Sequence, residues 1–102
     1  MIVVQQTEHY ARWFSALRDR TARAQIDVRI RRLSLGNAGD AKPVGGGVSE
    51  LRIDFGPGYR VYFVQKGEVV IILLAGGDKR SQSTDIRIAK ELSKMIQEKP
   101  WP

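Results

Sequence analysis

The chain has 102 residues, a length typical of one domain, and its 42% hydrophobic and 27% charged residues indicate a globular protein. Its 17 basic and 11 acidic residues give a net charge of +6, so its surface will attract polyanions, either nucleic acid or an acidic partner. The absence of cysteine and the single histidine exclude a disulfide framework, a thiolate zinc site and a His-rich metal centre, and we expect neither metal nor cofactor. The longest apolar run, Val69 to Ala75, is too short to cross a membrane, and no signal peptide is visible, so we expect a cytoplasmic protein.

The first third of the chain is predicted to form a strand and two amphipathic helices. Residues 2–6 begin with β-branched residues and predict the strand, and Thr7 followed by Glu8 is typical of a helix N-cap. Apolar residues then recur at helical spacing in two blocks. In the first helix they are Tyr10, Trp13, Phe14 and Leu17, and in the second, over residues 21–35, they are Ala22, Ile26, Ile30 and Leu33. Gly36 and Asn37 are expected to end the second helix.

The middle of the chain is predicted to form a loop and three strands. Residues 36–47 hold five glycines and one proline and are expected to be a loop. Hydrophobicity then alternates with a period of two over residues 48–55 and again over 59–65, with a Gly-Pro-Gly turn between them. A third strand over residues 68–75 is apolar on both faces, so we expect it to be central, and a Lys-Gly link joins it to the second strand as a hairpin.

The last element is predicted to be a helix that begins near Ser83. Its expected buried side is Ile88, Leu92, Met95 and Ile96, and residues 98–102 are expected to fray because proline ends the helix. The element order is therefore β-α-α-β-β-β-α, in which paired helices precede an antiparallel meander. This order predicts an α+β fold, with a small antiparallel sheet packed by helices, in a single domain over residues 1–102.

Most of the excess positive charge lies in residues 11–32, where seven arginines stand against two aspartates. One-signed charge of this kind favours a surface that contacts phosphates, although a solvated helix face that keeps the protein soluble has the same pattern. The expected RNA contacts are Arg23, Arg29, Arg31 and Arg32. Lys42, in the glycine-rich loop, is either a further phosphate contact or a solvated loop residue.

A second set of polar residues lies on the predicted sheet. Glu50, Arg52 and Asp54 share one strand face, Arg60 comes from the adjacent strand, and Lys79 and Arg80 follow the central strand. On rigid elements, such a basic face suits the positioning of a phosphodiester and the stabilisation of charge on a phosphorane. A cross-strand ladder of ion pairs among Glu50, Arg52 and Arg60 explains the same pattern equally well.

Three stretches of the chain combine these motifs in a recognisable order. They are Leu33-x-x-Gly36-Asn37-x-Gly39-Asp40-x-Lys42; Val48-x-Glu50-Leu51-Arg52-Ile53 leading to Gly56-Pro57-Gly58-Tyr59-Arg60-Val61-Tyr62-Phe63; and Gly76-Gly77-Asp78-Lys79 with Gln82 and Asp85-Ile86. Their order and spacing resemble the RelE/ParE toxin superfamily, most closely its HigB-like branch of phage-related addiction module killers. The resemblance extends from the aromatic helix to about Leu92.

The resemblance implies the growth-inhibiting toxin of a type II toxin–antitoxin module. It implies an endoribonuclease that cuts ribosome-bound messenger RNA without a metal, using the ribose 2′-OH. By position, the resemblance implies Arg60 as the arginine that clamps the phosphate and Lys79 or Arg80 as the basic residue after the last strand. We therefore expect Arg60 to stabilise the phosphorane and Lys79 or Arg80 to stabilise the leaving oxygen. From the strand face described above, we expect Arg52 to position the RNA, with Glu50 beside it in the catalytic site. The partners implied are the ribosome, its messenger RNA and a cognate antitoxin. That antitoxin is expected to resemble a helix-turn-helix repressor and to cover the basic face with an acidic segment.

Two departures from the RelE-like pattern leave proton transfer open. Val48 and Glu50 stand where RelE-like sequences carry lysines, and Asp85 and Ile86 stand where other members carry a tyrosine or histidine. Either Glu50, Asp85 or Lys42 transfers the proton, or the ribosome supplies most of the catalysis, or the protein is not a nuclease. In the last case it is a ParE-like inhibitor of DNA gyrase or a nucleic-acid-binding module without chemistry.

Overall fold

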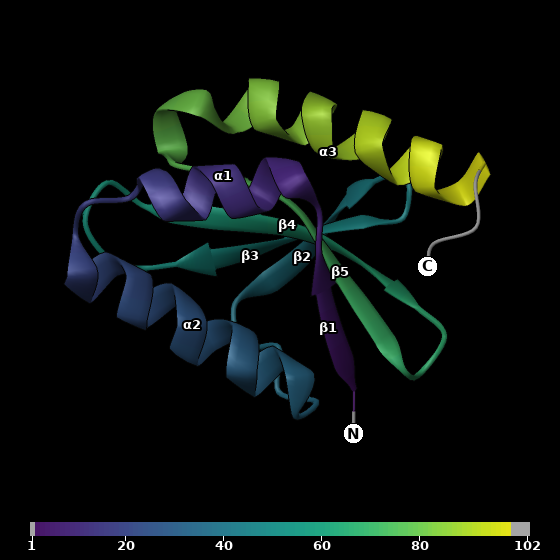
Figure 1. The fold of residues 1–102 in the computed structure, drawn as a ribbon, viewed down its shortest axis with the longest axis horizontal. Helices are drawn as coiled ribbons and strands as arrows, with labels where there is room; N and C mark the ends of the chain where they lie inside the picture. Colours follow the sequence, from purple (N-terminus) through teal and green to yellow (C-terminus); the bar gives the residue numbers. More distant parts are fainter. Residues whose placement is uncertain (1, 99–102) are drawn as a thin grey trace.

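The computed structural model describes residues 2–98, which form a five-stranded sheet with helices on both faces (Figure 1). The elements in chain order are β1 (Val3–Gln6), α1 (Glu8–Ala16), α2 (Arg20–Ser34), β2 (Ala41–Gly45), β3 (Val48–Ile53), β4 (Tyr59–Lys66), β5 (Val70–Gly77), the 3₁₀ turn η1 (Lys79–Ser81) and α3 (Gln82–Glu98). This arrangement confirms the predicted α+β class, and every predicted helix and strand is present within one or two residues of its expected start.

The strand order of the sheet is β1-β5-β4-β3-β2. Strands β2 to β5 pair with their chain neighbours in antiparallel fashion, which confirms the predicted meander. The sheet as a whole is mixed, because β1 pairs with β5 in parallel. β5 therefore has a strand on each side, in agreement with its apolar residues on both faces.

The prediction of a loop over residues 36–47 is wrong in part, because this stretch contains strand β2. Gly46 and Gly47 have φ of +63° and +79° and link β2 to β3. Two residues with positive φ form the tight hairpin turn that suits the twist of the strands, and glycine adopts this conformation without strain. Pro43 is tolerated because β2 is an edge strand of the sheet.

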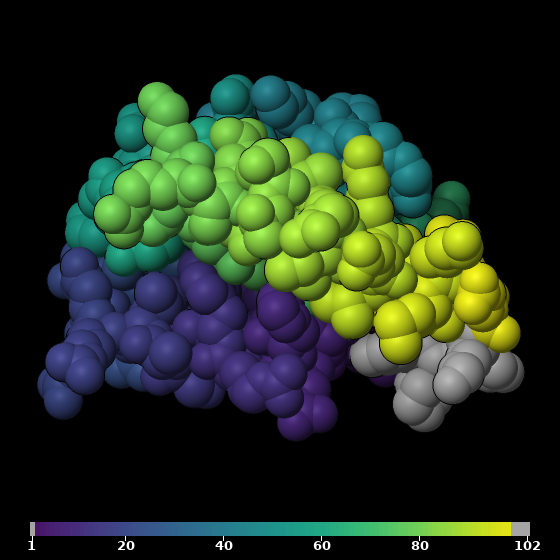
Figure 2. All heavy atoms as spheres, turned by 90° about the horizontal axis from the view of Figure 1, so that it is seen from above, coloured from purple at the N-terminus to yellow at the C-terminus, as the bar shows by residue number. Residues whose placement is uncertain are grey.

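Two hydrophobic clusters, one on each side of the sheet, hold the helices in place. α1 and α2 cover one face, and α3 covers the other; Figure 2 shows α3 in green to yellow running across the molecule. The first cluster contains Tyr10, Ile26, Leu33, Leu51, Ile53, Val61, Phe63, Ile71 and Leu73. The second contains Val48, Tyr62, Val64, Ile72, Leu74, Ala75, Ala89 and Ile96. The side chains of β3, β4 and β5 therefore alternate between two separate cores.

The buried side of α3 differs from the prediction at Met95 and includes residues that were not predicted. Met95 is 56% exposed. Ala89, Ser93 and Ile96 are buried, and they recur at helical spacing on the side of α3 that packs on the sheet. Glu98, expected in a frayed tail, is the last residue of α3, and the rest of that predicted tail lies outside the described residues. Among residues 2–98, no helix has the length and apolar character that a membrane span requires.

The first helix is fixed to β5 by two contacts. The Thr7 hydroxyl caps α1 by accepting from the Tyr10 amide (3.0 Å), and it donates to the carbonyl oxygen of Leu74 (2.7 Å). Further along α1, the Trp13 ring packs so closely on Gly76 that a Cβ at that position would overlap with it.

Candidate functional site

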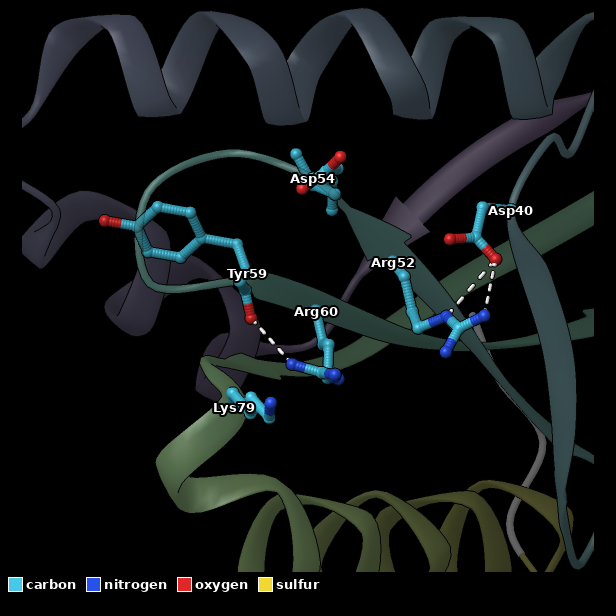
Figure 3. A pocket seen from close by; sticks show the side chains of 8 residues that line it. Asp40, Arg52, Asp54, Tyr59, Arg60 and Lys79 are labelled. Carbon is cyan, nitrogen blue, oxygen red and sulfur yellow. Dashed lines mark hydrogen bonds and ion pairs between the residues drawn. The ribbon is translucent and has the colours of Figure 1, made fainter.

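A pocket of about 370 Å³ lies where β3 ends and β4 begins, and η1 closes it on one side (Figure 3). Its lining residues are Asp40, Arg52, Ile53, Asp54, Gly58, Tyr59, Arg60 and Lys79. Three of them are cations and two are carboxylates. The structure thus brings together three predicted site residues, Arg52, Arg60 and Lys79, from three different elements.

Arg52 and Arg60 lie directly opposite each other on β3 and β4. Like charges in this position repel each other and destabilise a sheet, and each arginine is compensated by a different carboxylate. Arg52 donates from Nε and Nη2 to Oδ1 of Asp40 (3.2 and 2.9 Å), and this hydrogen bond raises the pKa of Arg52. Arg60 Nε lies 3.7 Å from Glu50 Oε2. The predicted ladder of ion pairs is therefore present only between Glu50 and Arg60.

Arg60 and Lys79 are the cations of the pocket that are best placed to bind an anion. Arg60 Nη1 donates to the Gly58 carbonyl (2.8 Å), and only 12% of the Arg60 side chain is exposed, so the guanidinium is held in one place. Figure 3 shows the Lys79 side chain, from η1, beside this guanidinium. Lys79 is exposed, and within residues 2–98 no carboxylate lies within 4.0 Å of its Nζ.

Glu50 lies beneath the pocket and does not line it. Its side chain is fully buried, and Oε2 accepts hydrogen bonds from the Tyr62 hydroxyl (3.1 Å) and from Nε2 of Gln82 (2.9 Å). Burial, with the charge of Glu50 as a further cause, raises the pKa of Tyr62, so its hydroxyl remains a donor. Glu50 therefore touches Arg60 rather than anything that enters the pocket.

Arg80 and the predicted RNA contacts lie outside the pocket. Arg80 is exposed and forms an ion pair with Asp78 (3.7 Å). On α2, Arg31 and Arg32 are exposed, whereas Arg23 is half-buried. Arg29 is also half-buried, and it donates to the carbonyls of Arg52 (2.6 Å) and Ala38 (3.2 Å). Lys42 is exposed on β2 and pairs in register with Glu50. Of the arginines of α2 predicted to contact RNA, the two exposed ones therefore lie in its C-terminal turn.

None of the three residues considered for proton transfer lines the pocket. Asp85 is 8% exposed, accepts a hydrogen bond from the Ser81 hydroxyl (2.5 Å), and has a pKa raised by burial. The carboxylates that do line the pocket are Asp40 and Asp54. The sequence indicated Asp54, because period-two alternation places it on the same strand face as Arg52. Asp40 is part of the family motif, but no pattern in the sequence placed it beside Arg52, because its position depends on strand β2.

The chain is similar to proteins of a phage-associated family. The family model of the phage-derived Gp49-like proteins matches residues 12–94. An uncharacterized protein of Haemophilus influenzae is 47% identical over 95 residues, which cover 93% of this chain and 96% of that protein. The matched range includes every residue that lines the pocket.

Proposed function

Because the chain belongs to the phage-derived Gp49-like family, a toxin–antitoxin-associated family related to RelE-like toxins, we propose that it is a toxin that cuts messenger RNA on the ribosome. The observation that carries this proposal is the pair of cations in the pocket, Arg60 and Lys79, on rigid elements at the end of the sheet. In this proposal the toxin acts in the cytoplasm and belongs to the HigB-like branch.

The proposed reaction is cleavage by the neighbouring ribose hydroxyl. The 2′-oxygen attacks the phosphorus and loses its proton, and the bond from phosphorus to the 5′-oxygen breaks. The products are a 2′,3′-cyclic phosphate and a 5′-hydroxyl. Arg60 stabilises the negative charge of the phosphorane, and Lys79 stabilises the leaving 5′-oxygen, which takes up a proton from the Lys79 ammonium or from water. Arg52 positions the neighbouring backbone, with its own charge partly balanced by Asp40.

The proton of the 2′-hydroxyl needs an acceptor in the pocket. Arg52 already engages Asp40 through two hydrogen bonds, whereas no cation lies within 4.0 Å of the Asp54 carboxylate among residues 2–98. Asp54 is exposed and lines the pocket, so it is open to a bound RNA strand. We assign it the role of general base.

The exposed arginines of α2 supply docking rather than chemistry. Arg31 and Arg32 lie in the last turn of α2, on the opposite face of the sheet from α3. In this proposal they contact ribosomal RNA, and their contribution will weaken as salt increases. A cognate antitoxin with an acidic segment is the partner expected to neutralise this surface.

Primer extension on a defined message, with and without ribosomes, tests the proposed function. Site-specific cuts that require both ribosomes and the toxin support it. Growth arrest with intact message and DNA damage signalling would instead indicate inhibition of gyrase. If neither cuts nor arrest occur, the pocket only binds nucleic acid.

A further inference from the structure

The buried polar cluster beneath the pocket contains two atoms that lack a hydrogen bond. Within residues 2–98, Arg60 Nε and Glu50 Oε1 are both buried without a hydrogen-bond partner. The Nε–H group lies beside the same carboxylate, 3.7 Å from its other oxygen, Oε2. Because water is excluded from both groups, their attraction is screened much less than that of an exposed ion pair.

Glu50 is itself held from behind, so it forms a fixed anchor. Tyr62, on the adjacent strand β4, and Gln82, at the start of α3, both donate to Oε2. Arg60 has a second attachment, from Nη1 to the Gly58 carbonyl. The guanidinium is therefore fixed at two points, of which one is ionic, and the rest of it faces the pocket.

Burial of a full negative charge costs free energy of desolvation, and this free energy is regained only through interactions with a cation and with hydrogen-bond donors beside the charge. Arg60 is the only cation within 4.0 Å of the Glu50 carboxylate among residues 2–98. Removal of the carboxylate would leave the Tyr62 and Gln82 donors in place, but Arg60 would lose its ionic contact at Nε. The hydrogen bonds to Glu50 and its ion pair therefore act together on the orientation of the Arg60 guanidinium.

We propose that Glu50 is a positioning residue, whose buried carboxylate, held by Tyr62 and Gln82, orients the Arg60 guanidinium toward the phosphate in the pocket. The assignment of a phosphodiester as ligand rests on the proposed function, whereas the orientation of Arg60 does not. As a positioning residue, Glu50 exchanges no proton with the substrate.

The test compares Glu50→Gln with Tyr62→Phe and with Asp40→Asn. Glu50→Gln keeps the shape and removes the charge, and Tyr62→Phe keeps the charge and removes one donor. Asp40→Asn makes the same change at the carboxylate beside Arg52. In ¹⁵N-labelled protein, the Nε–H resonance of Arg60 reports its orientation and its exchange with water. We expect exchange about tenfold faster in Glu50→Gln, as a buried pair becomes mobile, a smaller increase in Tyr62→Phe and none in Asp40→Asn.

Cleavage kinetics supply a readout that a purely structural role would not change. In Glu50→Gln we expect kcat to fall by up to about 10²-fold while KM stays within about threefold, because misorientation acts in the transition state. The pH–rate profile of Glu50→Gln should keep its shape while the rate falls at every pH, whereas loss of a general base would change the shape. An altered profile, or a wild-type Arg60 resonance and kcat in Glu50→Gln, would overturn the proposal.

Two further outcomes are decisive as well. If Glu50→Gln does not fold, Tyr62→Phe decides, because it keeps the buried ion pair and removes one of the two donors that hold the Glu50 carboxylate in place: Arg60 exchange and kcat that both equal the wild-type values in that variant contradict the proposal. If the wild-type protein cuts no RNA, the proposed function fails, and the Arg60 resonance alone decides whether Glu50 positions Arg60.

Discussion

Arg29 of α2 donates a 2.6 Å hydrogen bond to the backbone carbonyl of Arg52, a residue of the pocket on the neighbouring strand β3. A second bond, of 3.2 Å, joins Arg29 to the carbonyl of Ala38. An arginine that the sequence assigned to RNA contacts thus connects α2 to the strand behind the pocket. Its guanidinium therefore stabilises β3, the strand that carries Arg52, from the side of α2.

The first prediction follows from these two hydrogen bonds. Arg29→Ala leaves two carbonyls without a charged donor and should lower the free energy of unfolding by about 1.5–3 kcal/mol. Arg32→Ala, the matched control on the exposed side of the same helix, should change it by less than about 0.5 kcal/mol. Urea unfolding measures both. Equal effects of the two substitutions would show that Arg29 has no structural role.

A second prediction concerns the contact between α1 and β5. In Gly76→Ala, the added methyl group overlaps with the Trp13 ring, so the variant should lose about 1–3 kcal/mol of stability. Replacing Trp13 by leucine in that background should recover part of the loss, because the two changes are coupled. A double-mutant cycle by urea unfolding measures this coupling, and strictly additive effects would contradict the contact.

A third prediction concerns the dependence of stability on pH. Burial raises the pKa of Asp85 above its ordinary value, with the hydrogen bond from Ser81 opposing the shift. Between the ordinary and the raised pKa, the folded state binds more protons than the unfolded state, so stability falls as the pH rises through this window. Asp85→Asn removes that loss. It should have a higher Tm than the wild type at pH 7 and no advantage near pH 3, and an advantage that persists at low pH would contradict this explanation.

The fourth prediction tests the assignment of the general base. Asp54→Asn should lower the rate of RNA cleavage by about 10²- to 10⁴-fold, while inorganic phosphate still binds the pocket with nearly wild-type affinity. Single-turnover cleavage and titration by calorimetry measure the two effects separately. Undiminished cleavage would assign the proton to another group, in the protein or in the ribosome.

Much of this site could be predicted because it depends on local patterns. Period-two alternation placed Arg52 and Arg60 on one face of β3 and β4, and the end of the apolar run placed Lys79 at the edge of the sheet. Asp40 was missed because a strand as short and as rich in glycine and proline as β2 has no propensity signal. It forms because β3 offers a partner, as in the 2.9 Å bond from the Arg52 amide to the Asp40 carbonyl.

Burial of the polar residues could not be predicted, since it depends on packing between distant segments. Alternation placed Glu50 beside Arg52 on a polar face, but α3 covers Glu50 through Gln82, 32 residues further along the chain, and leaves Arg52 accessible. In the same way, net charge alone does not separate Arg29, which is bonded to the sheet, from Arg32, which is exposed.

The central claim is that Arg60 in the pocket performs the toxic chemistry. The most direct measurement is growth after induction of Arg60→Ala in bacterial cells, with folding verified by circular dichroism. Arg87→Ala, at an exposed position on α3, is the matched control. We predict that Arg60→Ala relieves growth arrest while Arg87→Ala arrests growth like the wild type. Undiminished arrest by folded Arg60→Ala would contradict the account.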